Sequence, residues 1–214
     1  MGENRIKLVA ADMDGTLLNR ERKITKYTQN VIKKAMAQGV YFVPATGRAV
    51  NALPPELKEM EGIRYGIFSN GATIYDLKEE KVIYKNHFEM DRVLELMDFL
   101  KQFDLMESIS LNGQSYANKK EMENIDYYEL DSNTKAIVQG SRVLVDDLEM
   151  FVKEQSTTVE KTTLLFKTME ERRRAADALS KIEDIQFSSS LPKNIEISKK
   201  GCNKGDGLLH LAKS

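Results

Sequence analysis

The chain has little of several residue types whose scarcity excludes whole classes of protein. Its 214 residues include one cysteine, no tryptophan, two histidines and four prolines. The single cysteine, Cys202, excludes an intrachain disulfide framework and fits a reducing compartment. No apolar run approaches the roughly 20 residues that a membrane-spanning helix needs, and no signal-peptide core follows the N-terminus. We therefore expect a cytoplasmic protein that has no membrane partner.

Neither sign of charge predominates in the composition. The chain carries 32 Lys and Arg against 33 Asp and Glu, a formal net charge of −1, and 41% of its residues are hydrophobic. This is the balance of a globular protein, and it provides no overall positive field to attract nucleic acid. The basic run at 172–174 is flanked by acids, so we expect a solvated helix face there and no nucleic-acid partner.

The first third of the chain predicts a strand, a helix and a second strand. Residues 6–11 form a short apolar run that suits a strand buried on both faces. A helix is expected at 26–38, with Thr25 as its N-cap, followed by a strand at 40–46. An Asn-Gly pair at 70–71 then predicts a hairpin. Strand, helix and strand in this order indicate a parallel βαβ unit and hence an α/β core.

The pattern changes after about residue 81. A strand at 82–88, a hairpin around the Asn-Gly pair at 112–113 and several amphipathic helices indicate an α+β module rather than more parallel sheet. The chain then ends in a strand and the opening of a helix. We therefore expect a split core domain at 1–81 and 190–214, with an α+β domain inserted at 82–189.

Two aspartates, one residue apart, follow the first predicted strand in the stretch DMDGT. Ligands of open α/β sheets bind outside the carboxyl ends of the strands. We interpret Asp12 as a carboxylate nucleophile and Asp14 as a general acid and base. Gly15 allows a sharp turn and offers a backbone amide to an anion. The alternative that stays open is an Asx-rich turn after a strand, without catalytic meaning.

Two further stretches are expected at the same edge of the sheet. In PATGR, Thr46 offers a hydroxyl and Gly47 a backbone amide, while Arg48 either serves the substrate or begins a solvated helix. Lys204 opens the last predicted helix, where backbone amides and an ammonium group can meet a phosphate. A lysine at a helix start is usually a surface residue, but its combination with the other stretches predicts a phosphate site.

These stretches together resemble the haloacid dehalogenase (HAD) superfamily of phosphohydrolases, in its Cof-type branch. The matching residues are DMDGT at 12–16, ATGR at 45–48, SNGA at 69–72 and EISKKGCNKG at 196–205. The resemblance implies a Rossmann-like HAD core with an inserted α+β cap domain. It also implies Mg²⁺-dependent hydrolysis of a small phosphorylated metabolite, such as a sugar phosphate, through an aspartyl-phosphate intermediate.

The resemblance assigns a role to each matching residue. Asp12 would attack phosphorus, and Asp14 would protonate the leaving oxygen and then activate water. Mg²⁺ would bind the Asp12 carboxylate and the backbone carbonyl of Asp14. The remaining residues of the set would contact the substrate. Gly15, Thr46, Gly47 and Lys204 would lie at the phosphate, Asn70 would lie close to the leaving group, and Arg48 would lie near the substrate.

The resemblance has one gap, because the family's acidic fourth motif, which supplies the remaining Mg²⁺ carboxylates, finds no match. Asp206 comes too soon after Lys204 and is expected on the helix itself. Asp12 must approach a negatively charged phosphate, and like charges 4 Å apart repel by about 4 kcal/mol at an effective dielectric constant of 20. A Mg²⁺ ion held by fewer carboxylates offsets this repulsion less securely. We therefore expect weak or absent turnover from this chain alone. The alternatives are a non-catalytic HAD remnant or phosphate-binding protein, and a chain shortened by a premature stop.

The same gap has a structural consequence. Without the family's C-terminal strands, the strand at 6–11 becomes an edge strand with unpaired backbone groups. We expect self-association or strand exchange to cover this edge.

Overall fold

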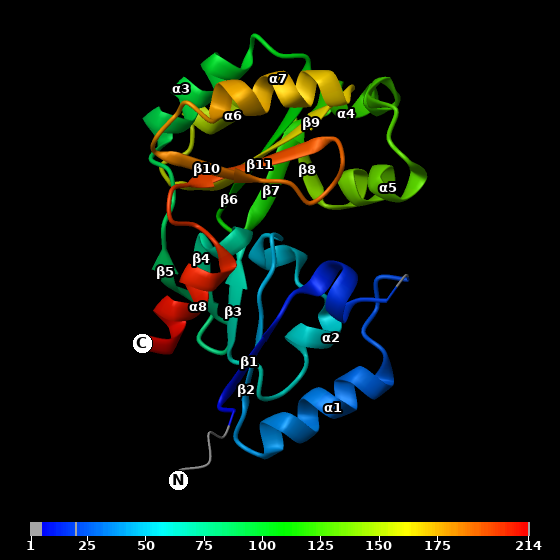
Figure 1. Cartoon of the computed structure of the whole chain (residues 1–214), viewed down its shortest axis with the longest axis vertical. Helices are drawn as coiled ribbons and strands as arrows, with labels where there is room; N and C mark the ends of the chain where they lie inside the picture. Colours follow the sequence, from blue (N-terminus) through cyan, green and yellow to red (C-terminus); the bar gives the residue numbers. More distant parts are fainter. Residues whose placement is uncertain (1–5, 20, 214) are drawn as a thin grey trace. The chain divides into compact units, whose positions relative to one another are not determined.

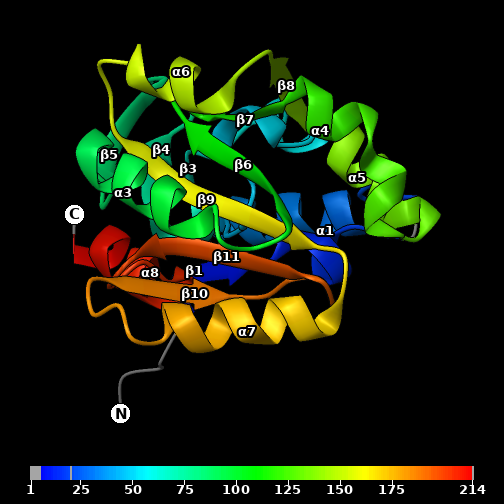
Figure 2. The same cartoon turned by 90° about the horizontal axis from the view of Figure 1, so that it is seen from above.

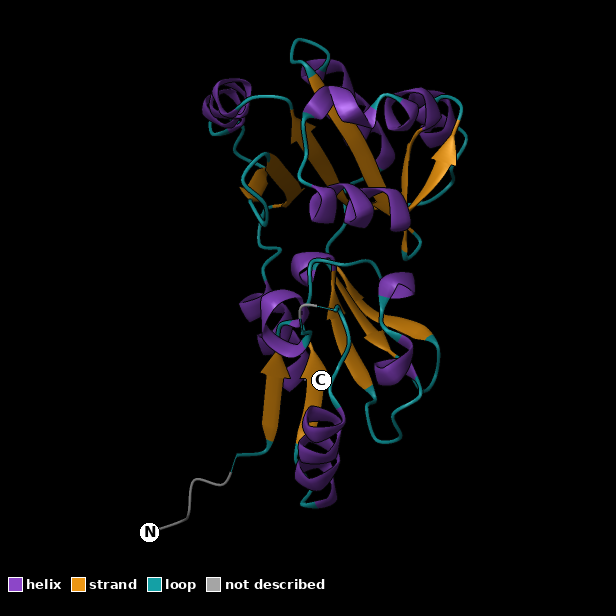
Figure 3. Ribbon diagram, turned by 90° about the vertical axis from the view of Figure 1, so that its right-hand side faces the viewer, coloured by secondary structure: helices purple, strands orange, loops and turns teal. Residues whose placement is uncertain are grey.

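The computed structural model describes residues 6–19 and 21–213, and their contacts divide the chain into two units (Figure 1). Unit 1 consists of Met1–Lys85 and Asn203–Ser214, and unit 2 consists of Asn86–Cys202. Figure 3 shows that each unit contains both strands and helices. The predicted α/β class and the predicted insertion of one unit into the other are confirmed.

Unit 1 begins with the predicted parallel βαβ arrangement. Strands β1 (Leu8–Ala11) and β2 (Tyr41–Pro44) pair in parallel, and α1 (Lys26–Ala37) connects them. The Thr25 hydroxyl accepts a hydrogen bond from the Thr28 amide, so Thr25 caps α1 as predicted. A parallel bridge from Ala45 to Ile67 continues the sheet into an antiparallel meander. The meander comprises β3 (Tyr65–Phe68), β4 (Thr73–Asp76) and β5 (Lys81–Lys85).

Helices cover both faces of the unit 1 sheet. The first face packs Phe42 and Phe68 against Ile32 of α1, and the second packs Val43 and Ile67 against Leu211. The other helical segments are η1 (Met13–Leu17), η2 (Val50–Ala52), α2 (Pro55–Lys58), η3 (Ser69–Gly71) and α8 (Lys204–Lys213). Within the described residues β1 pairs only with β2, which leaves β1 at the edge with Val9 39% exposed.

Unit 2 is a six-stranded sheet with the strand order β10-β11-β9-β6-β7-β8 (Figure 2). Its strands are β6 (Leu105–Leu111), β7 (Gln114–Asn118), β8 (Arg142–Val145), β9 (Val159–Phe166), β10 (Ile185–Ser188) and β11 (Asn194–Lys199). Its helices are α3 (Met90–Leu100), α4 (Lys119–Glu123), η4 (Ile125–Tyr128), α5 (Ser132–Gly140), α6 (Leu148–Lys153) and α7 (Met169–Leu179). Apolar residues of α3, α6 and α7 form one core with Ile109 and Leu111 of β6.

The structure places both boundaries between the units later in the chain than the sequence predicted. Strand β5, expected in the insertion, pairs with β4 and so belongs to unit 1. Strand β11, expected in the core, pairs with β9 and β10 and so belongs to unit 2. The boundaries therefore fall after Lys85 and before Asn203. In each case strand pairing, which the local sequence does not encode, decides the assignment.

The two ends of unit 2 lie side by side. The Asn86 side-chain amide donates to the Lys200 carbonyl at 3.0 Å, and the Cys202 thiol contacts the Asn86 carbonyl at 3.0 Å. The chain therefore enters and leaves unit 2 at neighbouring points.

Among the described residues, no helix combines the length and the apolar character that crossing a bilayer requires.

Candidate active site

The stretch DMDGT forms a closed turn directly after β1. The Asp12 carbonyl accepts from the Leu17 amide at 3.2 Å, and the Asp12 Oδ1 atom accepts from the Met13 amide at 2.8 Å. Gly15 adopts a φ of +77°, and a Cβ atom added there would meet nothing within 4 Å, so backbone conformation rather than space favours glycine. Asp12 and Asp14 therefore lie where the sequence predicted, at the carboxyl end of the first strand.

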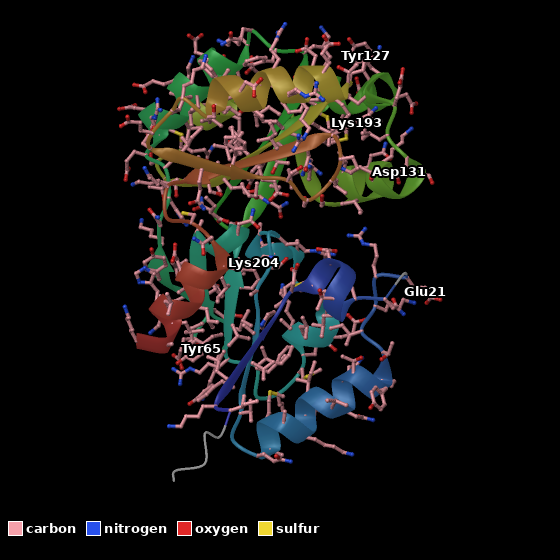
Figure 4. All side chains as sticks on the ribbon, viewed as in Figure 1. Glu21, Tyr65, Tyr127, Asp131, Lys193 and Lys204 are labelled. Atoms are coloured by element: carbon pink, nitrogen blue, oxygen red, sulfur yellow. The ribbon has the colours of Figure 1, made fainter. Side chains whose placement is uncertain are left out.

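Asp12 forms an ion pair with Lys204, and Lys204 lies at the start of α8 (Figure 4). The Lys204 Nζ atom lies 2.8 Å from Asp12 Oδ1, and the two side chains are 37% and 41% exposed. Both the amide of Met13 and the ammonium of Lys204 thus contact the same carboxylate oxygen. No described residue donates a hydrogen bond to the second oxygen, Oδ2, which leaves it accessible to a ligand.

The start of α8 is fixed by a reciprocal cap. The Asn203 Oδ1 atom accepts from the Asp206 amide at 2.9 Å, and the Asn203 side-chain amide donates to Asp206 Oδ2 at 2.6 Å. Asn203 is thus the N-cap of α8, with a second contact between the two side chains, and Asp206 lies on the helix as predicted. A Cβ atom at Gly71 would lie 2.2 Å from the Asn203 carbonyl oxygen. Glycine at 71 therefore allows η3 to approach the start of α8 and so helps to position Lys204.

Asp14 is held by Arg48 through both carboxylate oxygens. Arg48 Nη2 lies 2.6 Å from Asp14 Oδ1, and Nε lies 2.9 Å from Oδ2, which is a bidentate pair. Arg48 Nη1 also donates to the Ala52 carbonyl at 3.2 Å, and the arginine side chain is only 18% exposed. The Arg48 side chain therefore contacts Asp14 and is not solvated, while its predicted role toward the substrate stays a prediction.

Thr46 and Asn70 belong to the loops that follow β2 and β3. The Thr46 hydroxyl accepts from the Arg48 amide at 3.2 Å, and the Thr46 carbonyl accepts from the Asn70 amide at 3.0 Å. Thr46 is 1% exposed, so in this structure its hydroxyl shapes the turn that carries Gly47 and Arg48. These contacts bring Thr46, Arg48 and Asn70 into one hydrogen-bonded group.

Sequence reasoning missed two residues that shape the site. Ser69 is buried, has a φ of +49°, and donates its amide to the Arg48 carbonyl at 2.9 Å. Asn203 caps the helix that carries Lys204. An asparagine before a predicted helix is a recognisable capping signal, whereas a positive φ at a serine has no signal in a single sequence.

The donor set fits Mg²⁺ bound mostly by water. The Asp12 carboxylate and the Asp14 carbonyl offer oxygen ligands of the type that Mg²⁺ prefers, and Mg²⁺ in proteins often keeps several waters beside one or two carboxylates. Among residues 6–19 and 21–213, no group of three or more His, Cys, Asp or Glu side chains is placed to hold a metal ion. A bound ion would therefore have few direct protein ligands among the residues described.

An α/β sheet with acids and bases gathered at the carboxyl ends of its strands has the form of an enzyme site. Residues 9–214 match the family of haloacid dehalogenase-like hydrolases, and the chain belongs to that family. The predicted membership of the HAD superfamily is thereby confirmed.

Relatives of known sequence match different shares of this chain. A relative from Buchnera aphidicola subsp. Schizaphis graminum is 38% identical over 121 residues, which are 55% of this chain and 43% of the relative. The chain thus spans less than half of that relative. The 5-amino-6-(5-phospho-D-ribitylamino)uracil phosphatase YcsE of Bacillus subtilis is 26% identical over 207 residues, 95% of this chain and 69% of that protein.

Solved structures share the fold. A haloacid dehalogenase-like hydrolase from B. subtilis superposes with a TM-score of 0.79 at 22% identity, over 97% of this chain and 78% of the other. A sugar phosphatase of HAD subclass IIB superposes with a TM-score of 0.73 at 21% identity, over 97% of this chain and 75% of the other. At these identities the likeness concerns the fold alone.

Proposed function

We propose that the chain is a phosphohydrolase that acts on a small phosphorylated metabolite through an aspartyl-phosphate intermediate. The observation that supports this most is the geometry of Asp12, whose Oδ1 atom is held by Lys204 and the Met13 amide while Oδ2 stays accessible. A carboxylate fixed in this way can act as a nucleophile. Sugar phosphates are one substrate class, since one structural neighbour is named as a sugar phosphatase.

The residues of the site have complementary roles in this proposal. Asp12 Oδ2 attacks phosphorus while the bond to the leaving oxygen breaks, and Asp14 gives that oxygen a proton. Water then attacks the aspartyl phosphate as Asp14 takes a proton from it, which releases inorganic phosphate, restores the Asp12 carboxylate and returns Asp14 to its protonated form. Lys204 and Arg48 contribute two positive charges beside two acids, and Arg48 positions Asp14.

In this proposal the predicted phosphate ligands would assist these steps. The amides of Gly15 and Gly47 and the Thr46 hydroxyl would bind phosphoryl oxygens, with Asn70 nearer the leaving group. Mg²⁺, held by Asp12 and the Asp14 carbonyl, would supply neutralisation of the phosphate charge.

A second candidate is a protein that binds phosphate without turning it over. The observation that favours it is the small number of acidic ligands described at the site. The test is hydrolysis of an aryl phosphate, with and without Mg²⁺, by the wild-type chain, by Asp12→Asn and by Glu61→Gln, which changes an exposed acid elsewhere in unit 1. Turnover that only Asp12→Asn abolishes supports the hydrolase. Absence of turnover in a folded chain that still binds phosphate supports the second candidate.

We also propose that the open edge of β1 associates with a second copy of the chain. The edge exposes unpaired backbone groups together with Ile6 and Val9, which are 66% and 39% exposed. Light scattering tests this: Val9→Lys should shift a dimer to the monomer, and a monomeric wild-type chain at micromolar concentration contradicts the proposal. The cytoplasmic location expected from the single cysteine stays a prediction.

A further inference from the structure

One face of the unit 2 sheet carries a row of polar side chains. The strand register places Arg142 beside Ser115, Ser115 beside Ser110, and Ser110 beside Lys161. Directly opposed residues of neighbouring strands point to the same face of a sheet. The four side chains therefore form one row across β8, β7, β6 and β9, whose order can be followed in Figure 2.

This row lies on the face away from α3, α6 and α7. Ile109 and Leu111 pack into the apolar core with those helices. Ser110 lies between them on β6, so its side chain points to the opposite face. The Ser110 and Ser115 hydroxyl oxygens are 2.8 Å apart, so one hydroxyl proton lies between them and the other remains to be donated. Two short hydroxyl side chains thus stand between two long cationic ones.

The two cations of the row differ in how their charge is balanced. Lys161 Nζ lies 2.8 Å from Glu196 Oε2, and both side chains are nearly buried, at 9% and 8% exposed. In contrast, no carboxylate of the described residues lies within ion-pairing distance of Arg142. Arg142 is therefore the cation of the row that lacks a carboxylate at ion-pairing distance, although the more distant negative charge of Glu196 also acts on it.

Neutral acceptors fix the orientation of the Arg142 guanidinium. Nε donates to the Ser108 hydroxyl at 3.1 Å, and Nη1 donates to the Val138 carbonyl at 3.0 Å and the Ser141 hydroxyl at 3.1 Å. Nη2 donates to no residue that the structure describes. Burial lowers the pKa of Arg142 to about 10, although the negative charge of Glu196 acts in the opposite direction, and at this value the side chain stays charged at neutral pH. A largely buried charge with no carboxylate at ion-pairing distance is costly, and an anion bound directly to it would compensate it more fully.

We propose that Arg142, together with Ser115 and Ser110, binds the oxyanion group of a small molecule, either a carboxylate or a phosphate. Nη2 supplies two donors to the anion, and the serine pair supplies one more. Charge-assisted hydrogen bonds from a fixed guanidinium suit both kinds of oxyanion. This site lies wholly within unit 2 and does not depend on the function proposed for unit 1.

The experiment is an NMR titration of the full chain with sodium phosphate at constant ionic strength, following the backbone amides of β7 and β8. Saturable shifts are expected in the wild-type chain and in Lys204→Ala, which changes only the site in unit 1. Arg142→Gln should weaken phosphate binding by about tenfold to a hundredfold, which is the change in affinity that the loss of a hydrogen bond to a charged group usually causes. The matched control Arg173→Gln, at an exposed arginine of α7, should leave it unchanged.

Ser115→Val provides a second test if Arg142→Gln does not fold. Valine suits a strand, so this variant keeps Arg142 and removes one hydroxyl, and it should bind phosphate several-fold more weakly. Three results would overturn the proposal: absence of saturable shifts in the wild-type chain, equal shifts with sodium chloride, or unchanged affinity in the folded variants.

Discussion

Glu107 gives a prediction about stability that depends on pH. It alternates along β6 with Ile109 and Leu111, so its carboxyl group lies on the helix-covered face of the unit 2 sheet. Its Oε1 atom is buried and has no hydrogen-bond partner among the described residues. Burial, and then the negative charges of Glu121 and Glu149, raise the pKa of Glu107 from 4.5 to about 8. The native chain therefore holds a proton that the unfolded chain releases.

The direction of the effect follows from proton linkage. Between pH 4.5 and about 8 the native state binds more protons than the unfolded state, so the free energy of unfolding falls as the pH rises. Glu107→Gln resembles the protonated side chain and removes this dependence. The variant should match the wild-type chain below pH 4.5 and exceed its stability by up to about 3 kcal/mol at neutral pH, at 1.36 kcal/mol for each pKa unit.

The assay is urea unfolding over a series of pH values, followed at the methyl groups of Ile109, which is buried in unit 2. Glu123→Gln is the matched control, because Glu123 is an exposed glutamate in the same unit. Burial raises the pKa of the neighbouring Glu121 to about 7, so some pH dependence should remain in Glu107→Gln. Parallel stability curves for the wild-type chain and Glu107→Gln across the whole pH range would refute the reasoning.

Two further predictions concern unit 1 and are measured by urea unfolding with circular dichroism. Gly71→Ala should destabilise the chain by about 2–4 kcal/mol, because its Cβ would overlap the Asn203 carbonyl at a φ of +101°. Gly39→Ala, with a similar φ of +81° but open space, should cost only about 1 kcal/mol, and equal losses would contradict the role of close approach. Burial alone would raise the pKa of Asp76, but hydrogen bonds from two backbone amides and Arg64 outweigh it and lower that pKa. Asp76→Asn should therefore lower the free energy of unfolding by about 2 kcal/mol at neutral pH. In strong acid it should change nothing, because the stability that Asp76 contributes is lost as the pH falls through its lowered pKa. A loss that does not depend on pH would contradict this.

Local signals in the sequence were sufficient for most of unit 1. The apolar run at 6–11, the Thr25 cap and the Asn-Gly pair at 70–71 each predicted an element that the structure contains. The order of these elements predicted the parallel pairing of β1 with β2, since short connections and a crossover helix leave few alternatives. The carboxyl ends of these strands then placed Asp12 and Thr46 on the same edge of the sheet.

Other features depend on contacts between distant residues and were not predictable from local patterns. Whether β5 belongs to one unit or the other depends on its pairing with β4. The short helices α4 and α5 and the strand β8 lack a clear apolar period, and none of them was predicted. The choice of partners at the site, Lys204 for Asp12 and Arg48 for Asp14, depends on side-chain packing that spacing alone does not fix.

The adjacent ends of unit 2 affect how the site can form during folding. Asp12 and Lys204 are far apart in the sequence, and closing so long a loop carries an entropic cost and slows folding. Once unit 2 has folded, the contacts of Asn86 with Lys200 and Cys202 bring its two ends together. For the folding of unit 1, α8 then follows β5 almost as if the insertion were absent. Substitutions that delay the folding of unit 2 should therefore delay the pairing of Lys204 with Asp12, although they lie outside unit 1.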